Sequence, residues 1–220
     1  MTRLLLVDDH PLMRKGLALT LEAEPDLQVV GQAADADEAI DAFNKLKPDL
    51  ALIDISLPGM GGLELTRHLL SVTPDALILI VSRHDESLYA ERAVRAGAKG
   101  YVTKLEAADT IVKAVRQVLR GGIYMSEDAK DRMLFGAATG RKLPGQSPME
   151  VLSDRELEVF ELTGRGIPTR EIAEKLHLSV KTVESYRARI KTKLNLNSGT
   201  ELLQHAVQWV DRESSVEDDQ

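Results

Sequence analysis

The run Ala51-Leu-Ile-Asp54-Ile-Ser-Leu-Pro-Gly59 decides the fold of the first half of the chain. Three apolar residues lead into an aspartate, and a Pro-Gly turn follows. A short apolar run bounded by turn residues is typical of a strand that is buried on both faces of a parallel sheet. Asp54 would then lie at the carboxyl end of the strand, where open α/β sheets bind ligands. An isolated aspartate in a turn is usually structural, so a chemical role for Asp54 depends on its neighbours.

Four more apolar runs predict strands on either side of this one, over residues 4–7, 27–31, 76–82 and 100–103. Apolar residues at helical spacing separate them, and a last helix is predicted over residues 107–120. Strands that alternate with helices indicate a parallel sheet with right-handed crossovers. We therefore predict an α/β domain with a doubly wound, five-stranded parallel sheet in the flavodoxin-like order 2-1-3-4-5.

That strand order brings polar residues from distant parts of the chain to one edge of the sheet. They are Asp8, Asp9, Asp54, Ser82 and Lys104. Carboxylates in one pocket raise one another's pKa unless a cation compensates, and an oxygen-rich acidic pocket suits Mg²⁺. Lys104 supplies a positive charge for an anion and Ser82 supplies a hydroxyl. The pattern predicts a site for a phosphoryl group, which a carboxylate nucleophile can accept as an aspartyl phosphate.

Composition limits the classes of protein. Hydrophobic residues make up 43% of the 220 residues and charged residues 29%, a balance that indicates globular domains with real cores. The absence of cysteine excludes disulfides and thiolate metal sites. No apolar run is long enough for a membrane span or a secretion signal, so a cytoplasmic protein is expected. The net charge of −7 argues against indiscriminate nucleic-acid binding by the whole chain, although it permits a local basic face.

From Leu152 the chain has a helical pattern, and we predict a small all-α domain of four helices. Ser153 and Glu156 have the spacing of a capping box, and Thr169 is the predicted N-cap of the next helix. A third helix is predicted over residues 180–194, and a fourth begins at Ser198 or Thr200. Between residues 165 and 193, eight basic residues stand against three acidic ones. Such a run can be only a solvated helix face, but two helices joined by a tight turn also suggest a helix-turn-helix.

The motifs Asp8-Asp9-His10-Pro11, Asp54-Ile-Ser-Leu-Pro-Gly59, Ser82 and Tyr101-Val-Thr-Lys104 together resemble the receiver domain of two-component response regulators. The resemblance implies that Asp54 is the phosphoacceptor. It also implies that Mg²⁺ is held by Asp9, Asp54 and the backbone carbonyl of Ser56, with Asp8 acting indirectly. Lys104 and Ser82 would contact the phosphoryl oxygens. Movement of Ser82 and an inward turn of Tyr101 would form the switch, although an aromatic residue in a strand is otherwise an ordinary core residue.

Three residues near this edge could modify the chemistry. Arg83 stands where a small residue is usual in receiver domains, and Leu105 stands where a small or acidic residue is usual. Arg83 could crowd the pocket or pair with the phosphate. His84 is either a lid residue that affects hydrolysis or a solvated loop residue.

The segments Leu152-Ser-Asp-Arg-Glu156, Arg170-Glu-Ile-Ala-Glu-Lys-Leu176 and Ser179-Val-Lys-Thr-Val-Glu-Ser-Tyr186 look like the DNA-binding domain of NarL/LuxR-type regulators. The resemblance implies that the third helix enters the major groove of double-stranded promoter DNA. The candidate DNA contacts are Lys181, Thr182, Glu184, Ser185, Arg187, Arg189 and Lys193. The last helix usually forms a dimer contact, here with Leu203 and Val207, although Val207 could instead belong to the domain core.

We therefore divide the chain into a receiver (residues 1–121), a linker (122–148), a LuxR-type helix-turn-helix domain (149–212) and an acidic, disordered tail (213–220). The predicted function is that of a response-regulator transcription factor, not an enzyme. A sensor histidine kinase would phosphorylate Asp54, and phosphorylation would promote homodimers on DNA, with RNA polymerase as a candidate partner.

Two other functions fit parts of the sequence. One is a constitutive DNA-binding protein with a vestigial receiver. The other is an aspartate-nucleophile phosphatase, which requires a general acid two residues after the nucleophile; that position is Ser56 here.

Overall fold

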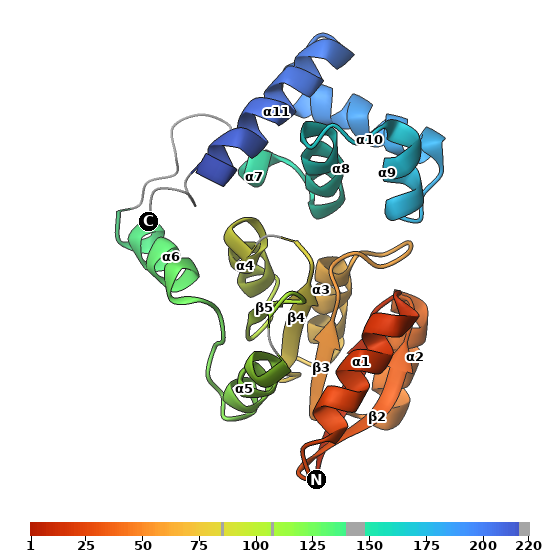
Figure 1. The fold of residues 1–220 in the computed structure, drawn as a ribbon, viewed down its shortest axis with the longest axis vertical. Helices are drawn as coiled ribbons and strands as arrows, with labels where there is room; N and C mark the ends of the chain where they lie inside the picture. The colour runs from red at the N-terminus through yellow and green to blue at the C-terminus, as the bar shows by residue number, and fades with distance from the viewer. Residues whose placement is uncertain (85, 107, 140–147, 216–220) are drawn as a thin grey trace. The chain divides into compact units, whose positions relative to one another are not determined.

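The computed structural model describes residues 1–84, 86–106, 108–139 and 148–215, and the chain divides into two compact units, Met1–Gly140 and Arg141–Gln220. The first unit contains a five-stranded parallel sheet in the order β2-β1-β3-β4-β5, as the sequence predicts (Figure 1). Its strands are β1 (Thr2–Val7), β2 (Leu27–Ala33), β3 (Leu50–Ile53), β4 (Ile78–Ser82) and β5 (Tyr101–Thr103).

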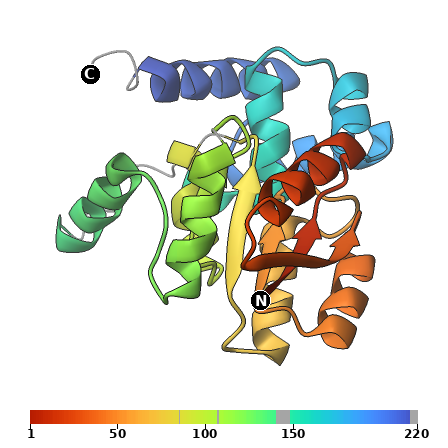
Figure 2. The ribbon, with the colours of Figure 1, turned by 60° about the horizontal axis from the view of Figure 1, so that its bottom comes forward.

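Helices cover both faces of this sheet. On one face lie α1 (Pro11–Glu22) and α5 (Ala108–Leu119), and on the other lie α2 (Ala36–Leu46), α3 (Gly62–Val72) and α4 (Glu86–Arg95) (Figure 2). The core under α1 and α5 joins Leu17 and Val115 to the strand residues Leu52 and Val81, all of them buried. The strands β3 and β4 are buried at every position because both faces are covered, which explains their continuous apolar runs, whereas the edge strand β2 is partly exposed.

Local sequence signals set where these helices begin. Pro11 opens α1 with its fixed φ, at a position where a missing N–H costs nothing. The side chain of Asp35 caps α2 by accepting a hydrogen bond from the backbone N–H of Glu38 at 2.9 Å. Both helix starts therefore follow from residue types that are visible in the sequence.

The chain after α5 remains attached to the sheet. Tyr124 forms a parallel bridge with Gly100, and the N–H of Tyr101 donates to the carbonyl of Tyr124 at 2.8 Å. The next helix, α6 (Glu127–Thr139), packs against α4 within the same unit. The stretch predicted as a linker thus contains one ordered helix, whereas residues 140–147 lie outside the described residues.

The second unit is helical among its described residues. Its elements are α7 (Pro148–Val151), α8 (Asp154–Gly164), α9 (Thr169–Lys175), α10 (Val180–Lys193) and α11 (Gly199–Ser215). Ser153 and Glu156 form the predicted capping box at the start of α8. Phe160 of α8 packs on Trp209 of α11 with ring centroids 5.5 Å apart, so Trp209 belongs to the core of this unit.

Two expectations for this unit were wrong in detail, and one short helix was missed. The N-cap of α9 is Pro168 rather than Thr169, which is the first helical residue. The single turn α7 was not predicted, because four residues are too few to show a helical period. Helix α11 continues to Ser215, beyond the predicted start of the disordered tail at residue 213, and residues 216–220 lie outside the described part of the chain.

Within the described part of the chain, no helix has both the length and the apolar character needed to cross a bilayer.

Two helical glycines provide a test of this packing. A Cβ at Gly62, the first residue of α3, would lie 1.8 Å from the carbonyl oxygen of Asp54, whereas a Cβ at Gly16 in α1 would meet nothing within 4 Å. We expect Gly62→Ala to lower the free energy of unfolding by about 1–3 kcal/mol through overpacking. Gly16→Ala should raise it by about 0.5–1 kcal/mol, because alanine is the better helix former. Urea unfolding of both variants measures the difference, and equal effects would contradict the close approach of α3 to Asp54.

Candidate functional site

The candidate site lies at the carboxyl ends of four strands. Asp8 directly follows β1, Asp54 follows β3, Ser82 ends β4 and Lys104 follows β5. Sheet-like hydrogen bonds continue past the strand ends and fix these backbones. The N–H of Asp54 donates to the carbonyl of Val7 at 2.9 Å, and the N–H of Lys104 donates to that of Ser82 at 2.7 Å. The sheet therefore fixes the backbone positions from which the functional side chains project.

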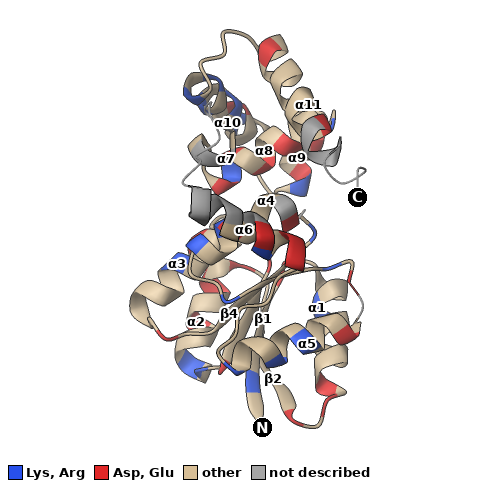
Figure 3. Cartoon of the chain, turned by 90° about the vertical axis from the view of Figure 1, so that its left-hand side faces the viewer, with Lys and Arg blue, Asp and Glu red and all other residues tan. Residues whose placement is uncertain are grey.

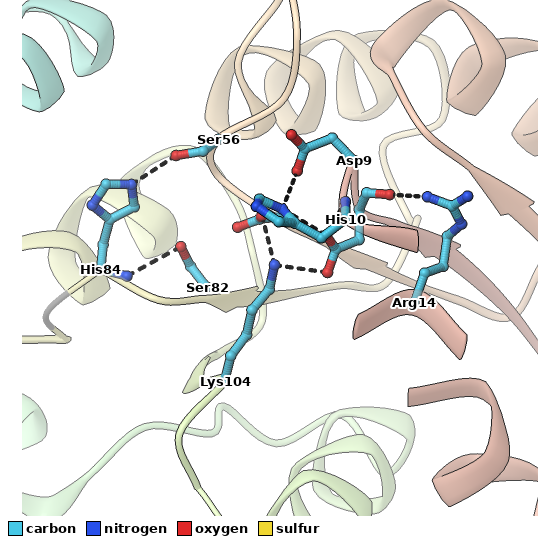
Figure 4. Close-up of polar contacts among 9 residues, drawn as sticks. Asp9, His10, Arg14, Ser56, Ser82, His84 and Lys104 are labelled. Atoms are coloured by element: carbon cyan, nitrogen blue, oxygen red, sulfur yellow. Dashed lines mark hydrogen bonds and ion pairs between the residues drawn. The ribbon is translucent and has the colours of Figure 1, made fainter. Parts of the chain in front are cut away.

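A buried ion cluster occupies this edge. The Nζ of Lys104 lies 2.7 Å from Oδ2 of Asp8 and 2.6 Å from Oδ2 of Asp54 (Figure 4). The three side chains are only 1%, 2% and 4% exposed, in the order Lys104, Asp8, Asp54. One ammonium thus serves two carboxylates, and Asp9 adds a third negative charge nearby. The cluster keeps an excess of negative charge that a divalent cation would neutralise.

The charge balance changes the acidity of Asp54. Burial raises the pKa of its carboxyl above the usual value, and the neighbouring Asp8 raises it further. The charge and hydrogen bond of Lys104 oppose this rise without overcoming it. A raised pKa means that the environment disfavours the ionised carboxylate. A cation that binds beside Asp54 would stabilise the ionised form.

The acids and one histidine form a compact set of potential metal ligands. One ligand atom each from Asp8, Asp9, His10 and Asp54 can be chosen so that all of them lie within 4.8 Å of one another. The oxygen-rich part of this set fits Mg²⁺. Sequence reasoning proposed the three aspartates but overlooked His10, although a histidine next to an Asp-Asp pair is a signal in itself. The predicted use of the Ser56 carbonyl stays a prediction.

The predicted switch residues are joined through His84. The hydroxyl of Ser82 accepts a hydrogen bond from the backbone N–H of His84 at 3.4 Å, and the hydroxyl of Tyr101 donates to the His84 carbonyl at 2.7 Å. The His84 ring reaches across to the loop after β3, where its Nε2 lies 2.8 Å from the Ser56 hydroxyl. His84 is therefore integrated into the site rather than solvated, and Tyr101 is fully buried. In contrast, Arg83 is exposed and Leu105 is 86% exposed.

A second candidate site is the helix-turn-helix of α9 and α10. Helix α9 ends where Leu178 N–H donates to the carbonyl of Ala173 at 2.8 Å and His177 takes a left-handed φ of 53°. Ser179 then caps α10 by accepting from the N–H of Thr182 at 3.0 Å. Lys and Arg residues lie along α10, which produces a basic helix in an acidic protein (Figure 3).

Two of the predicted DNA contacts are engaged within their own unit. A guanidinium nitrogen of Arg187 donates to the Thr169 hydroxyl at 2.6 Å, and Nζ of Lys193 donates to Oε2 of Glu156 at 2.6 Å. Burial acts to raise the pKa of Glu156, but hydrogen bonds from Lys193 and Ser153 outweigh it and the net pKa is lowered. Arg187 and Lys193 thus help to join α10 to its neighbours.

The other candidates on α10 differ in exposure. Lys181, Glu184, Ser185 and Arg189 are exposed, whereas Thr182 is half-buried beside Ser179. On α11, Leu203 is 42% exposed and Val207 is half-buried, while Leu202 and Ala206 face the core. The structure therefore leaves an exposed basic face on α10 and an apolar side chain on α11 available for partners.

Comparison with known protein families gives two matches that cover both units. Residues 4–116 match the family described as response regulator receiver domain. Residues 150–206 match the family described as bacterial regulatory proteins, luxR family.

Similar proteins extend over nearly the whole chain. Response regulator UvrY of Escherichia coli is 37% identical over 207 residues, which cover 94% of both chains. Response regulator GacA of Pseudomonas aeruginosa is 38% identical over 207 residues, which cover 94% of this chain and 96% of that protein. Among solved structures, RcsB from Salmonella enterica serovar Typhimurium, bound to promoter rprA in the presence of phosphomimetic BeF3−, is 25% identical with a TM-score of 0.60. This match covers 94% of this chain and 98% of that chain.

The ion cluster predicts a large effect on stability. Lys104→Met would leave the carboxylates of Asp8 and Asp54 buried without their cation, so we expect a loss of about 3–5 kcal/mol in unfolding free energy at neutral pH. Combining it with Asp54→Asn should recover part of that loss, because one of the two uncompensated charges is gone. Denaturant unfolding measures both, and Lys99→Met, which removes an exposed lysine, should stay within about 0.5 kcal/mol of the parent. A similar small effect for Lys104→Met would contradict the role given to its charge.

Proposed function

Because this chain belongs to the LuxR family of two-component response regulators, which are transcription factors with a receiver and a DNA-binding domain, we propose that phosphorylation of Asp54 controls its binding to promoter DNA. The observation that carries the proposal is the buried Asp54 carboxylate, held between Lys104 and Asp8 at the edge of the sheet. A turn or capping aspartate has no need of such partners, whereas a nucleophile that accepts a charged group does.

Mg²⁺ is the cofactor that the donor set supports best. Asp9, Asp54 and the Ser56 carbonyl would hold it, and Asp8 would act through water. When bound, it would supply positive charge for the carboxylates and for the oxygens of the incoming phosphoryl group. This role agrees with the excess of acid over base in the cluster, where three aspartates face one lysine.

The chemistry assigned to this chain is phosphoryl transfer to a carboxylate. An oxygen of Asp54 would form a bond to the phosphorus of a phosphohistidine on a sensor histidine kinase. The bond from phosphorus to the histidine nitrogen breaks, and the nitrogen keeps the electron pair. Lys104 would move from the carboxylate to a phosphoryl oxygen, and the Ser82 hydroxyl would donate to another. These two residues orient and neutralise the group but take no part in the covalent bond.

The switch follows from contacts that Ser82 would lose. Its hydroxyl accepts from the His84 N–H, and the His84 carbonyl accepts from Tyr101. Once Ser82 turns toward a phosphoryl group, the loop after β4 is free to rearrange, and the environment of Tyr101 changes with it. We assign the output to homodimers that contact each other through Leu203 and Val207 and read two half-sites about one helical turn apart. RNA polymerase is a candidate further partner.

Two alternatives are less well supported. A vestigial receiver would not need the complete cluster of Asp8, Asp9, Asp54 and Lys104. A phosphatase would need a general acid at Ser56, whose hydroxyl instead contacts His84. The related proteins are named as response regulators, which favours a phosphoacceptor with at most slow loss of its phosphate.

Labelling tests the phosphoacceptor directly. We expect acetyl phosphate with Mg²⁺ to add one acid-stable, hydroxylamine-sensitive phosphoryl group to the full chain, detected by intact mass. Asp54→Ala should abolish the adduct, and removal of Mg²⁺ with a chelator should do the same. Asp37→Asn, at an exposed position of α2, is the matched control and should label normally. Labelling that survives Asp54→Ala would exclude this site, and footprints on genomic DNA fragments that are unchanged by labelling would favour the vestigial receiver.

The DNA-binding face has its own test. Lys181→Ala on α10 should weaken binding to a footprinted fragment and to unrelated DNA by a similar factor. It should also reduce the magnitude of the slope of log affinity against log salt by about 1, as expected for one lost phosphate contact. Lys113→Ala, an exposed lysine of the receiver, should alter neither quantity. Fluorescence anisotropy at several salt concentrations measures both, and equal slopes for the two variants would remove α10 from the DNA interface.

A further inference from the structure

We propose that His10 is a ligand of the metal site at Asp9 and Asp54. Its imidazole would give this site a higher affinity for divalent transition metals than a site made of carboxylates alone. The inference deepens the proposed function and rests on it, because it concerns the same metal site. Its basis is the position of one nitrogen atom in the ion cluster.

The backbone around His10 is fixed by several contacts. His10 is the N-cap of α1, and Pro11 directly after it restricts the chain. Its N–H donates to Oδ1 of Asp8 at 2.9 Å, and its carbonyl accepts from the N–H of Arg14 at 3.0 Å. The guanidinium of Arg14 also donates to the carbonyl of Asp8. The imidazole therefore starts from a rigid point next to the acids.

The ring places Nδ1 inside the cluster. Nδ1 lies 2.6 Å from Oδ1 of Asp9 and 3.5 Å from Oδ1 of Asp8, and Figure 4 shows the ring lying against the carboxylates. The Nδ1 atom itself is buried, although the side chain as a whole is 43% exposed. The contact with Asp9 is an ion pair when the imidazole is protonated, and it lacks hydrogen-bond geometry. A buried nitrogen is thus aimed at carboxylate oxygens, in a position where a metal ion would replace the proton.

A shared metal ion accounts for this arrangement. Two adjacent ligands on an octahedral ion with bonds of about 2.1 Å lie about 3 Å apart, which is close to the separation of Nδ1 and Oδ1 of Asp9. The four ligand atoms, from Asp8, Asp9, His10 and Asp54, lie within 4.8 Å of one another. Opposite ligands of such an ion lie about 4.2 Å apart, so small side-chain movements would bring the four atoms within reach of one ion. The imidazole binds in its neutral form, with Nδ1 toward the ion and the proton on Nε2.

The donor type determines the expected selectivity. Mg²⁺ prefers oxygen ligands and holds its waters tightly, so it gains little from an imidazole. Mn²⁺ and Ni²⁺ accept nitrogen ligands, and the gain is larger for Ni²⁺. A receiver metal site with oxygen ligands alone lacks this contribution to the affinity. His10 would therefore make the site respond to the kind of divalent metal present and not only to its concentration.

Calorimetry on the untagged full chain tests the preference. We expect His10→Asn to weaken Ni²⁺ binding about tenfold or more, in line with the loss of a metal-orienting group, and to leave Mg²⁺ binding within about twofold. Asparagine is a favourable N-cap, so α1 should form normally in this variant. His68→Asn is the matched control, because His68 is exposed on α3 and is not one of the four clustered ligand residues, and it should leave the affinity at this site unchanged.

Spectroscopy gives a readout that a structural role would not produce. Pulsed electron paramagnetic resonance of Mn²⁺ bound to the protein should show coupling to a histidine nitrogen, identified by isotopic labelling of histidine. The coupling should persist in His68→Asn and disappear in His10→Asn. Thermal melting of each variant without metal verifies that it is folded, and His10→Gln provides a second replacement without a ring.

The outcomes separate this inference from the function on which it rests. If Mg²⁺ binds and Asp54 is labelled, but His10→Asn keeps its Ni²⁺ affinity and no nitrogen coupling is seen, His10 is not a ligand and the proposed function stands. If His10→Asn binds every metal more tightly, the imidazole competes with the metal and the inference is overturned. If the parent chain neither binds Mg²⁺ nor is labelled, both proposals fail.

Discussion

The contact of one buried ammonium with two buried carboxylates is the interaction on which this site depends. Lys104 lies within 2.7 Å of both Asp8 and Asp54, and none of the three side chains has appreciable access to solvent. Removing charges from water is costly, and an apolar cluster of similar size would often be as stable or more so. The arrangement is therefore best understood as chemical. It holds the carboxylate of Asp54, the proposed phosphoacceptor, in place and leaves an excess of negative charge for a cation. Burial at this site raises the pKa of Asp54, and Lys104 only partly offsets the rise.

The same edge of the sheet is connected to more distant parts of the receiver by hydrogen bonds. Ser82 contacts the backbone of His84, the carbonyl of His84 accepts from Tyr101, and the backbone of Tyr101 donates to Tyr124. Tyr124 precedes α6, which packs on α4. A rearrangement at Ser82 thus has a continuous path of hydrogen bonds through His84 and Tyr101 to the segment that precedes α6.

In the DNA-binding unit, basic residues on the same helix have different roles. Arg187 and Lys193 contact Thr169 and Glu156, so their charges help to fix α10 against its neighbours. Lys181 and Arg189 are exposed on the same helix. A basic helix is thus partly a structural element and partly a candidate DNA surface, and its net charge does not indicate which residue serves which purpose.

The sequence by itself determined the strand order, the helix starts at Pro11, Asp35 and Ser153, and the family, because apolar period, turn residues and caps are local signals. Boundaries such as α7 and the end of α11 were missed because short or polar helices depend on packing that no local pattern shows. Only the tertiary structure decided that Lys104 bridges two carboxylates, that His84 joins Ser56 to Tyr101, and that Nδ1 of His10 enters the acid cluster. These are contacts between side chains from different strand ends, and their distances follow from how the sheet twists and packs rather than from residue types along the chain.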